Sequence, residues 1–229
     1  MEALTIQTTL SDIPLLLGHR GARAFTSVPE NSFASFDLAL QQGCDGFEFD
    51  VRLSAAGRAL ICHNPKIRGV TISRARAHEL SDLPQMEEVI ERYGNRVFLD
   101  IELKVRGLEP KVLGALRDIR PQRDYVVSSF IPDVLLELKR RSAAIPLGLI
   151  CEKPGQLARW QGLPVDYVIC HKSLVNQQLI AGVRRAGRRI FIWTVNDRDG
   201  MLRAARLGVE GIISDQTELL VSVLRPKMD

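Results

Sequence analysis

Short apolar runs rich in β-branched and aromatic residues alternate with amphipathic segments of helical length along almost the whole 229-residue chain. Because parallel strands need a crossover connection, which is usually a helix, this alternation predicts βαβ units and a parallel sheet. Eight candidate strands in a chain of this length fit a compact (β/α)8 TIM barrel better than an open, doubly wound α/β sheet. The strands are expected at residues 15–18, 46–53, 97–103, 125–129, 147–151, 167–170, 190–195 and 211–214.

One segment interrupts the alternation after the second predicted strand. A second apolar run covers residues 59–62, and a loosely patterned stretch follows at 64–84. We interpret them as a hairpin extension of the strand and a small insertion. Because no linker, internal repeat or low-complexity segment is visible, we expect one domain over residues 1–229. The predicted helices lie at residues 32–42, 85–93, 110–119, 132–141, 175–186 and 198–207.

Charged residues recur with a period of two in the second and third predicted strands, which places them on one face of each strand. They are Glu48, Asp50 and Arg52 in one strand and Asp100, Glu102 and Lys104 in the other. Carboxylates this close would repel and raise one another's pKa unless a cation lay between them, and oxygen ligands suit Mg²⁺ or Ca²⁺. Alternatively, Arg52 and Lys104 could neutralise the acids in a buried ion-pair network, and alternation alone leaves this open.

Two histidines fall at the ends of predicted strands. His19 ends the first strand, and His63 follows the apolar run at 59–62. A single barrel histidine is more often structural than catalytic, but these two flank the acidic strand and could act as a general base and a general acid near neutral pH. Arg20 and Lys104 lie beside acids at strand ends, which an anionic substrate such as a phosphate would explain.

Four further residues occupy strand ends, where both structural and functional roles are open. Phe130 and Trp193 end the fourth and seventh strands, and core packing is the simpler interpretation. Asn196 and Asp215 follow the seventh and eighth strands, where helix capping is the ordinary role of such residues. Asn31 or Ser32 is expected to cap the first helix.

Charge and cysteine content restrict the class of protein further. The net charge of +4 does not by itself indicate a nucleic-acid partner, although it suits an anionic ligand. No stretch approaches the roughly 18 apolar residues of a membrane helix, and the first residues do not resemble a signal peptide. The four cysteines form no CxxC motif, so we predict buried free thiols. We therefore expect a cytoplasmic protein without stable membrane insertion.

Short motifs follow one another in a fixed order over nearly the whole chain. They are His-Arg-Gly from 19, Pro-Glu-Asn-Ser from 29, Glu-Phe-Asp-Val from 48, His63, Glu-Leu-Lys from 102, Ser-Phe from 129, Trp-Thr-Val-Asn from 193 and Ser-Asp from 214. Each motif is weak alone, but the ordered set resembles the signature of the glycerophosphodiester phosphodiesterase family. The chain departs from that signature at Asn64, where the family commonly has Asp.

The resemblance implies a TIM barrel with a small insertion near the active site. It also implies an enzyme that hydrolyses glycerophosphodiesters, such as glycerophosphocholine or glycerophosphoethanolamine, to sn-glycerol 3-phosphate and an alcohol, with Mg²⁺ or Ca²⁺ as cofactor. Carried onto this chain, it implies metal ligands Glu48, Asp50 and Glu102, an acid/base pair His19 and His63, substrate-binding Arg20, Lys104, Phe130 and Trp193, and supporting Glu30 and Asn196.

Two other functions are compatible with these motifs. A related phospholipase D-like lyase would act on lysophospholipids and stop at a cyclic phosphate, but such proteins are typically secreted and disulfide-bonded. A non-catalytic phosphate-binding barrel would be expected to lack a ligand or a histidine, and all are present. For the hydrolase, we expect a cyclic phosphate intermediate, with direct attack by water as the alternative.

Overall fold

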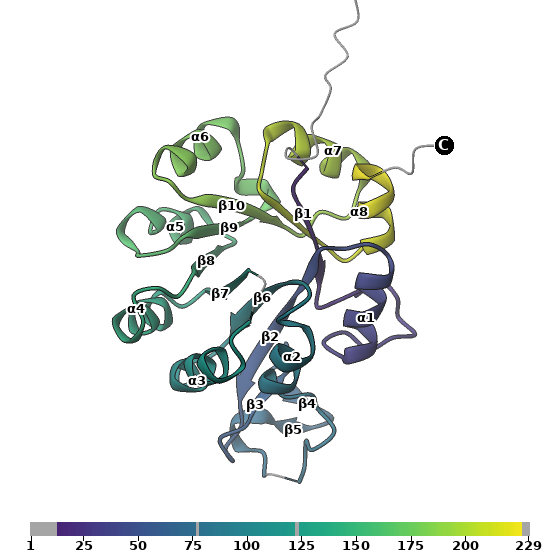
Figure 1. Cartoon of the computed structure of the whole chain (residues 1–229), viewed down its shortest axis with the longest axis vertical. Helices are drawn as coiled ribbons and strands as arrows, with labels where there is room; N and C mark the ends of the chain where they lie inside the picture. Colours follow the sequence, from purple (N-terminus) through teal and green to yellow (C-terminus); the bar gives the residue numbers. More distant parts are fainter. Residues whose placement is uncertain (1–12, 77, 122–123, 226–229) are drawn as a thin grey trace, which may run out of the picture.

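Eight parallel strands close into a barrel in the computed structural model, which describes residues 13–76, 78–121 and 124–225 (Figure 1). Pairing of the first strand with both the second and the last closes the ring. The predicted TIM barrel is therefore confirmed. Its strands are β1 (Leu15–His19), β2 (Gly46–Leu53), β6 (Phe98–Leu103), β7 (Tyr125–Ser129), β8 (Leu147–Cys151), β9 (Tyr167–His171), β10 (Arg189–Trp193) and β11 (Gly211–Ser214).

Helices surround the strands and complete the βα alternation (Figure 1). They are α1 (Phe33–Gln41), α2 (Met86–Tyr93), α3 (Glu109–Ile119), α4 (Pro132–Arg141), α5 (Pro154–Leu157), α6 (Gln177–Arg185), α7 (Arg198–Leu207) and α8 (Thr217–Leu224). Short 3-10 helices cover Ile72–Arg74, Trp160–Gly162 and Lys172–Leu174.

The observed elements differ from the predicted ones in three places. The four-residue helix α5 is too short to show a periodic pattern, and α8 is so rich in Leu and Val that its apolar positions show no clear face. The predicted strand at 190–195 ends at Trp193, because the Val195 amide donates to the Ile213 carbonyl of β11 instead of continuing along the ladder with β9.

Two apolar layers hold the barrel together. The outer layer lies between strands and helices, where Phe36, Phe47 and Tyr93 pack in stacked and edge-to-face geometry. The inner layer fills the barrel with side chains that point along the opposite face of the strands. Its buried members are Leu17, Phe98, Val126, Ile150, Tyr167, Ile169, Phe191 and Ile213. Among the described residues these side chains fill the interior below the mouth, and a cavity lies above them at the mouth.

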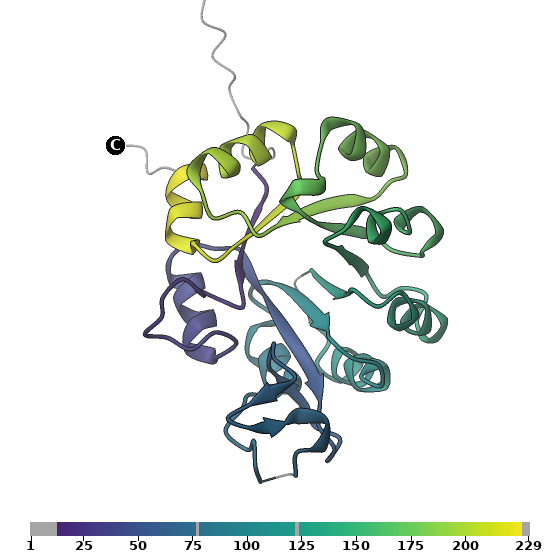
Figure 2. The ribbon, with the colours of Figure 1, turned by 180° about the vertical axis from the view of Figure 1, so that it is seen from behind.

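The segment after β2 forms the predicted hairpin and insertion. Strand β3 (Ala59–Ile61) pairs antiparallel with β2, and β4 (Lys66–Ile67) pairs with β5 (Val70–Thr71). Seen from behind, this segment projects outside the ring of helices (Figure 2). It has its own small apolar cluster, made of Leu60, Cys62, Ile72, Ala75 and Leu80.

The four cysteines are free and buried, as predicted. Among the described residues, none of the helices has the length and hydropathy needed to span a membrane.

Candidate active site

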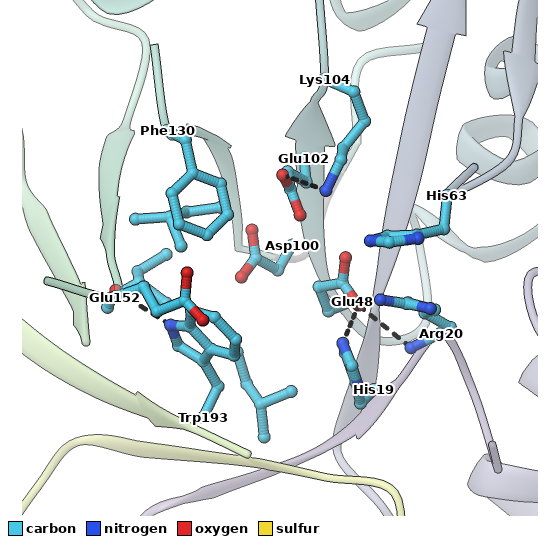
Figure 3. Close-up of a pocket in the computed structure, with 13 residues that line it drawn as sticks. His19, Arg20, Glu48, His63, Asp100, Glu102, Lys104, Phe130, Glu152 and Trp193 are labelled. Atoms are coloured by element: carbon cyan, nitrogen blue, oxygen red, sulfur yellow. Dashed lines mark hydrogen bonds and ion pairs between the residues drawn. The ribbon is translucent and has the colours of Figure 1, made fainter. Parts of the chain in front are cut away.

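A cavity of about 310 Å³ lies at the carboxyl ends of the barrel strands, and functional side chains enter it from both sides (Figure 3). Such cavities are the usual place for TIM-barrel active sites. The lining residues are His19, Arg20, Glu48, His63, Asp100, Glu102, Lys104, Phe130, Ile150, Glu152, Ile169, Trp193 and Ile213. Most of the residues selected from the sequence are therefore brought together. Asp50 and Glu30 do not line the cavity but contact Arg20, which does, and Asn196 contacts Asp215 behind the cavity wall.

Three buried carboxylates converge at one side of the cavity. Glu48, Asp50 and Glu102 each offer an oxygen, and these oxygens lie within 4.8 Å of one another. The parallel register places Asp50 directly beside Glu102, while Glu48 precedes Asp50 by one period of the strand. Within the described part of the chain, Glu48 Oε1 is buried without a hydrogen-bond partner. A hard divalent cation fits this all-oxygen donor set.

Burial and mutual repulsion disfavour the charged forms of two of these carboxylates when no cation lies between them. Burial, followed by the charges of Asp50 and Glu102, raises the pKa of Glu48 well above its usual range. Burial and the charge of Asp50 raise the pKa of Glu102 to about 8. Burial alone would raise the pKa of Asp50 too, but the cations of Lys104 and Arg20 outweigh it and lower that pKa. The cluster therefore holds more potential negative charge than its own cations balance.

The neighbouring cations neutralise only part of the cluster. Lys104 Nζ lies 3.1 Å from Asp50 Oδ1 and 2.7 Å from Glu102 Oε1, and Arg20 Nε lies 3.1 Å from Asp50 Oδ2. Arg52 does not join them, because its Nε donates to the His63 carbonyl at 2.7 Å. The alternative prediction was that Lys104 and Arg52 both neutralise the acids in an ion-pair network. It is correct for Lys104, which pairs with Asp50 and Glu102, and wrong for Arg52.

An unusual backbone conformation places Arg20 between the carboxylates. Its φ is +54°, and its backbone amide donates to Glu48 Oε2 at 3.0 Å while its guanidinium donates to Glu30 Oε1 at 2.9 Å. The next residue, Gly21, has a φ of +82°, and a Cβ there would lie 2.6 Å from the Ser35 carbonyl carbon. Only glycine fits this turn.

Asp215 holds the ring of His19, and capping is not its role. Helix α7 is capped by Asp197, whereas Asn196 Nδ2 donates to Asp215 Oδ2 at 2.6 Å. Asp215 Oδ1 lies 2.7 Å from His19 Nδ1. Burial would raise the pKa of Asp215, but the hydrogen bond and charge of His19 outweigh it and lower that pKa.

An ionised carboxylate can only accept, so Nδ1 of His19 donates to Asp215, and Nε2 is the ring nitrogen on the cavity side. That nitrogen lies 3.9 Å from Glu48 Oε2. The expectation that Asp215 and Asn196 cap a helix is therefore wrong, and the Ser-Asp motif at 214 was the available signal for a site role.

Neighbouring side chains contact both the backbone and the ring of His63. Arg52 binds the His63 carbonyl, and His63 Nδ1 lies 3.1 Å from Asn64 Oδ1. Burial lowers the pKa of His63. Asn64 therefore keeps a contact to the ring without the negative charge that Asp would bring.

Asn31 also supports the metal-ligand candidates, which the sequence did not indicate. Ser32 caps α1 through a hydrogen bond from the Ser35 amide, so Asn31 is free for another role. Its Nδ2 donates to Asp50 Oδ2 at 2.8 Å, and its Oδ1 accepts from the Asp50 amide at 3.2 Å. The amide side chain thereby fixes the orientation of the Asp50 carboxylate.

The opposite side of the cavity is aromatic and apolar. Phe130 and Trp193 cover the inner core, and their rings meet edge to face with centroids 5.8 Å apart. Both rings also line the cavity, so core packing describes only part of their position. Two acids that line the cavity were not selected as site residues from the sequence: Glu152, and Asp100, which lies beside Glu48 in the register of β2 with β6 and accepts from Ser128 Oγ at 2.5 Å.

Comparisons with known proteins show which family this chain is similar to. The model of the glycerophosphoryl diester phosphodiesterase family matches residues 19–103 and 75–219. A glycerophosphodiester phosphodiesterase of Caldanaerobacter subterraneus is 28% identical over 240 residues, covering 92% of this chain and 98% of the relative.

Two solved structures are also similar to this chain in sequence and in fold. A glycerophosphodiester phosphodiesterase from Thermotoga maritima is 25% identical with a TM-score of 0.80, and the match covers 92% of this chain and 98% of that one. An Oleispira antarctica phosphodiesterase, solved in complex with the product sn-glycerol-3-phosphate, is 27% identical with a TM-score of 0.81, covering 93% and 97%. The resemblance of the motifs is thus confirmed, and the chain belongs to the glycerophosphoryl diester phosphodiesterase family of enzymes.

Proposed function

We propose that this enzyme hydrolyses glycerophosphodiesters, such as glycerophosphocholine or glycerophosphoethanolamine, to sn-glycerol 3-phosphate and an alcohol with the aid of Mg²⁺ or Ca²⁺. The observation that carries the proposal is the convergence of Glu48, Asp50 and Glu102 in the same cavity as two histidines and Arg20. The product bound to the Oleispira antarctica relative supports the product class. The free, buried cysteines support the cytoplasmic location expected from the sequence, where disulfides are rare.

The acidic cluster is the proposed cation site, with Glu48, Asp50 and Glu102 as ligands and Asn31 orienting Asp50. When bound, the divalent ion would supply positive charge that offsets the charge of the phosphodiester as it shifts in the transition state. Arg20 and Lys104 bind the phosphate oxygens in this proposal, because both cations already lie at the boundary between the carboxylates and the open cavity. Glu30 supports Arg20 from behind.

The two histidines carry the proton transfers. We assign His19 as the general base, because the ionised Asp215 stabilises the imidazolium that forms when Nε2 takes up a proton. His63 is assigned as the general acid, because a lowered pKa makes its protonated ring the stronger proton donor. In Figure 3, Arg20 lies between the two rings, where a phosphate would meet both.

The proposed reaction begins with a glycerol hydroxyl of the substrate. His19 removes its proton, the oxygen bonds to phosphorus, and the bond from phosphorus to the alcohol breaks as His63 protonates the departing oxygen. Water then opens the cyclic phosphate, with the histidine roles reversed. A transient cyclic ³¹P signal in a single turnover supports this route, and its absence favours direct attack by water.

The decisive experiment is coupled detection of sn-glycerol 3-phosphate released from glycerophosphocholine and glycerophosphoethanolamine, with and without EDTA. We expect release that EDTA abolishes and that added Mg²⁺ or Ca²⁺ restores. His19→Ala and His63→Ala should each lower kcat by at least about 100-fold, whereas His78→Ala, an exposed histidine of the insertion, should not. Metal-independent release, or near-normal rates in either active-site variant, would contradict the proposal.

A further inference from the structure

We propose that Arg23 is a positioning residue for phosphate binding, which holds and neutralises Glu30 so that Arg20 keeps positive charge for the substrate. This inference rests on the proposed function and adds a residue that acts on the site from outside the cavity. Arg23 lies in the loop between β1 and α1, three positions after Arg20. It lines a second hollow of about 450 Å³ together with Glu30, Asn196 and Asp215.

Arg20 is paired with more negative charge than it can balance alone. Its Nε lies 3.1 Å from Asp50 Oδ2, its Nη1 donates to Glu30 Oε1 at 2.9 Å, and its side chain is only 10% exposed. A guanidinium between two ionised carboxylates has little net charge left for a phosphate unless further cations balance those carboxylates. Lys104 shares Asp50, because its Nζ lies 3.1 Å from Asp50 Oδ1. Glu30 therefore needs a second cation of its own.

Arg23 supplies that second cation. Its Nε donates to Glu30 Oε2 at 2.7 Å, so Arg20 and Arg23 hold one oxygen each. In the part of the chain that the structure describes, these two are the only cations within ion-pair distance of Glu30. Burial would raise the pKa of Glu30, but the charge of Arg20 and the hydrogen bond from Arg23 outweigh it and lower that pKa. Glu30 is thus an ionised carboxylate shared between two guanidinium groups.

Further hydrogen bonds fix the position of Arg23. Its Nη1 donates to Asp215 Oδ1 at 3.2 Å, and the amide of the next residue, Ala24, donates to the Asp215 carbonyl at 3.1 Å. On the other side, the Ala22 amide donates to the Ser35 carbonyl at 3.0 Å. The backbone of Arg23 is therefore held on both sides, and its guanidinium is presented from a defined position.

Loss of Arg23 should act on substrate binding more than on proton transfer. Asp215 would keep its contact to the imidazole of the general base at 2.7 Å and its contact to Asn196 at 2.6 Å. Glu30, in contrast, would keep Arg20 as its only partner and would offset the charge of Arg20 more completely. An interaction that is equally strong in the ground state and the transition state changes KM and leaves kcat nearly unaltered.

The test measures KM and kcat for glycerophosphocholine. We expect Arg23→Gln to raise KM about fivefold, the upper size of a partly exposed ion pair, and to change kcat less. Arg141→Gln is the matched control and should change neither constant, because Arg141 is 42% exposed and pairs with Glu137 on α4 as Arg23, 40% exposed, pairs with Glu30. In a Glu30→Gln background, Arg23→Gln should have no further effect on KM. An unchanged KM, a loss confined to kcat, or an equal loss in both backgrounds would overturn the inference.

Rescue by guanidinium separates positioning from a merely structural role. Arg23→Ala opens the second hollow, where free guanidinium can reach Glu30 and Asp215. We expect guanidinium, at concentrations too low to denature the protein, to lower the KM of this variant toward the wild-type value. Tetramethylammonium carries the same charge without N–H donors and should not do so. Failure of guanidinium to lower KM, or equal rescue by both ions, counts against the inference.

A binding measurement without turnover separates this inference from the proposed function. Calorimetric titration with inorganic phosphate in the presence of Mg²⁺ measures the affinity directly. We expect the Kd of Arg23→Gln to be about fivefold that of the wild type. If no diester is hydrolysed, the proposed function fails, and this titration still decides the role of Arg23. Equal affinities, or no binding of phosphate to the wild type, would show that Arg23 does not support a phosphate site.

Discussion

Replacing Asp215 by Asn tests whether the carboxylate behind His19 matters for proton transfer. The change keeps the size of the side chain but removes the charge that lies 2.7 Å from His19 Nδ1. Asp215 is only 15% exposed in its side chain, so solvent replaces little of the lost interaction. A hydrogen bond to a charged group contributes about 1.5–3 kcal/mol, and each 1.36 kcal/mol corresponds to about tenfold in rate. We therefore expect kcat to fall about 10- to 100-fold.

The change should appear in kcat and leave KM nearly unaltered. Asp215 does not line the cavity, and it acts on the imidazolium that forms only as His19 accepts a proton. Steady-state kinetics on glycerophosphocholine measure the two constants separately. Asp199→Asn is the matched control, because Asp199 is exposed on the neighbouring helix α7 and should leave both constants unchanged.

Two results would refute this reasoning. A kcat within twofold of wild type would show that the carboxylate does not assist His19, and a loss confined to KM would assign it to binding. If Asp215→Asn does not fold, Asn196→Ala tests the same chain of contacts, because Asn196 donates to Asp215 at 2.6 Å. A several-fold decrease in kcat is expected for that variant.

Three further predictions concern pH, the second histidine and backbone conformation. With a pKa of about 8 for Glu102, against an ordinary value of 4.5, the folded metal-free protein retains a proton that the unfolded chain has lost. Its stability should therefore fall as pH rises from about 5 to 8, by up to about 1.4 kcal/mol per pH unit. Calorimetric melting with and without Ca²⁺ should show a larger stabilisation by the ion at pH 8 than at pH 6; an equal shift would be inconsistent. Asn64→Asp adds a negative charge beside His63 and should raise its lowered pKa. The alkaline limb of the kcat–pH profile should then move upward by up to about one unit, and an unmoved limb would argue against His63 as the acid. Gly21→Ala should lower the free energy of unfolding by about 2 kcal/mol, because it strains a φ of +82° against Ser35. Gly182→Ala, in open space on α6, should raise it by about 0.5–1 kcal/mol, and urea denaturation compares the two.

The local periodicity of the sequence was sufficient to predict much of the fold and part of the candidate site. The alternation of apolar runs and amphipathic segments predicted the barrel strands, because each strand buries apolar side chains toward the helices. The period of two placed Glu48 and Asp50 on the same face of β2, and the structure brings Glu102 to them through the register of β2 with β6. The helices α5 and α8 were missed because a four-residue turn and a nearly all-apolar segment carry no readable period.

Other contacts depend on pairings between distant parts of the chain. His19 and Asp215 are 196 positions apart, and they meet because β1 closes the barrel against β11. The barrel closes because each strand pairs with its neighbour around the whole ring, and a short stretch of sequence carries no information about these pairings. Asn31 reaches Asp50 through a backbone conformation with a φ of +56°, and this conformation depends on the turn that precedes α1.

The order of the elements, the faces of the strands and the chemical types of the residues at the strand ends could thus be predicted without the structure. The motifs in their order were also enough to predict the family. Which of those residues are neighbours became visible in the folded chain: Asp215 lies behind His19, Arg52 binds the backbone of His63, and Glu152 lines the same cavity as Trp193. Periodicity is a property of residues that are close in sequence, whereas charge balance and hydrogen bonding in the cavity depend on distances that are set by closure of the whole barrel.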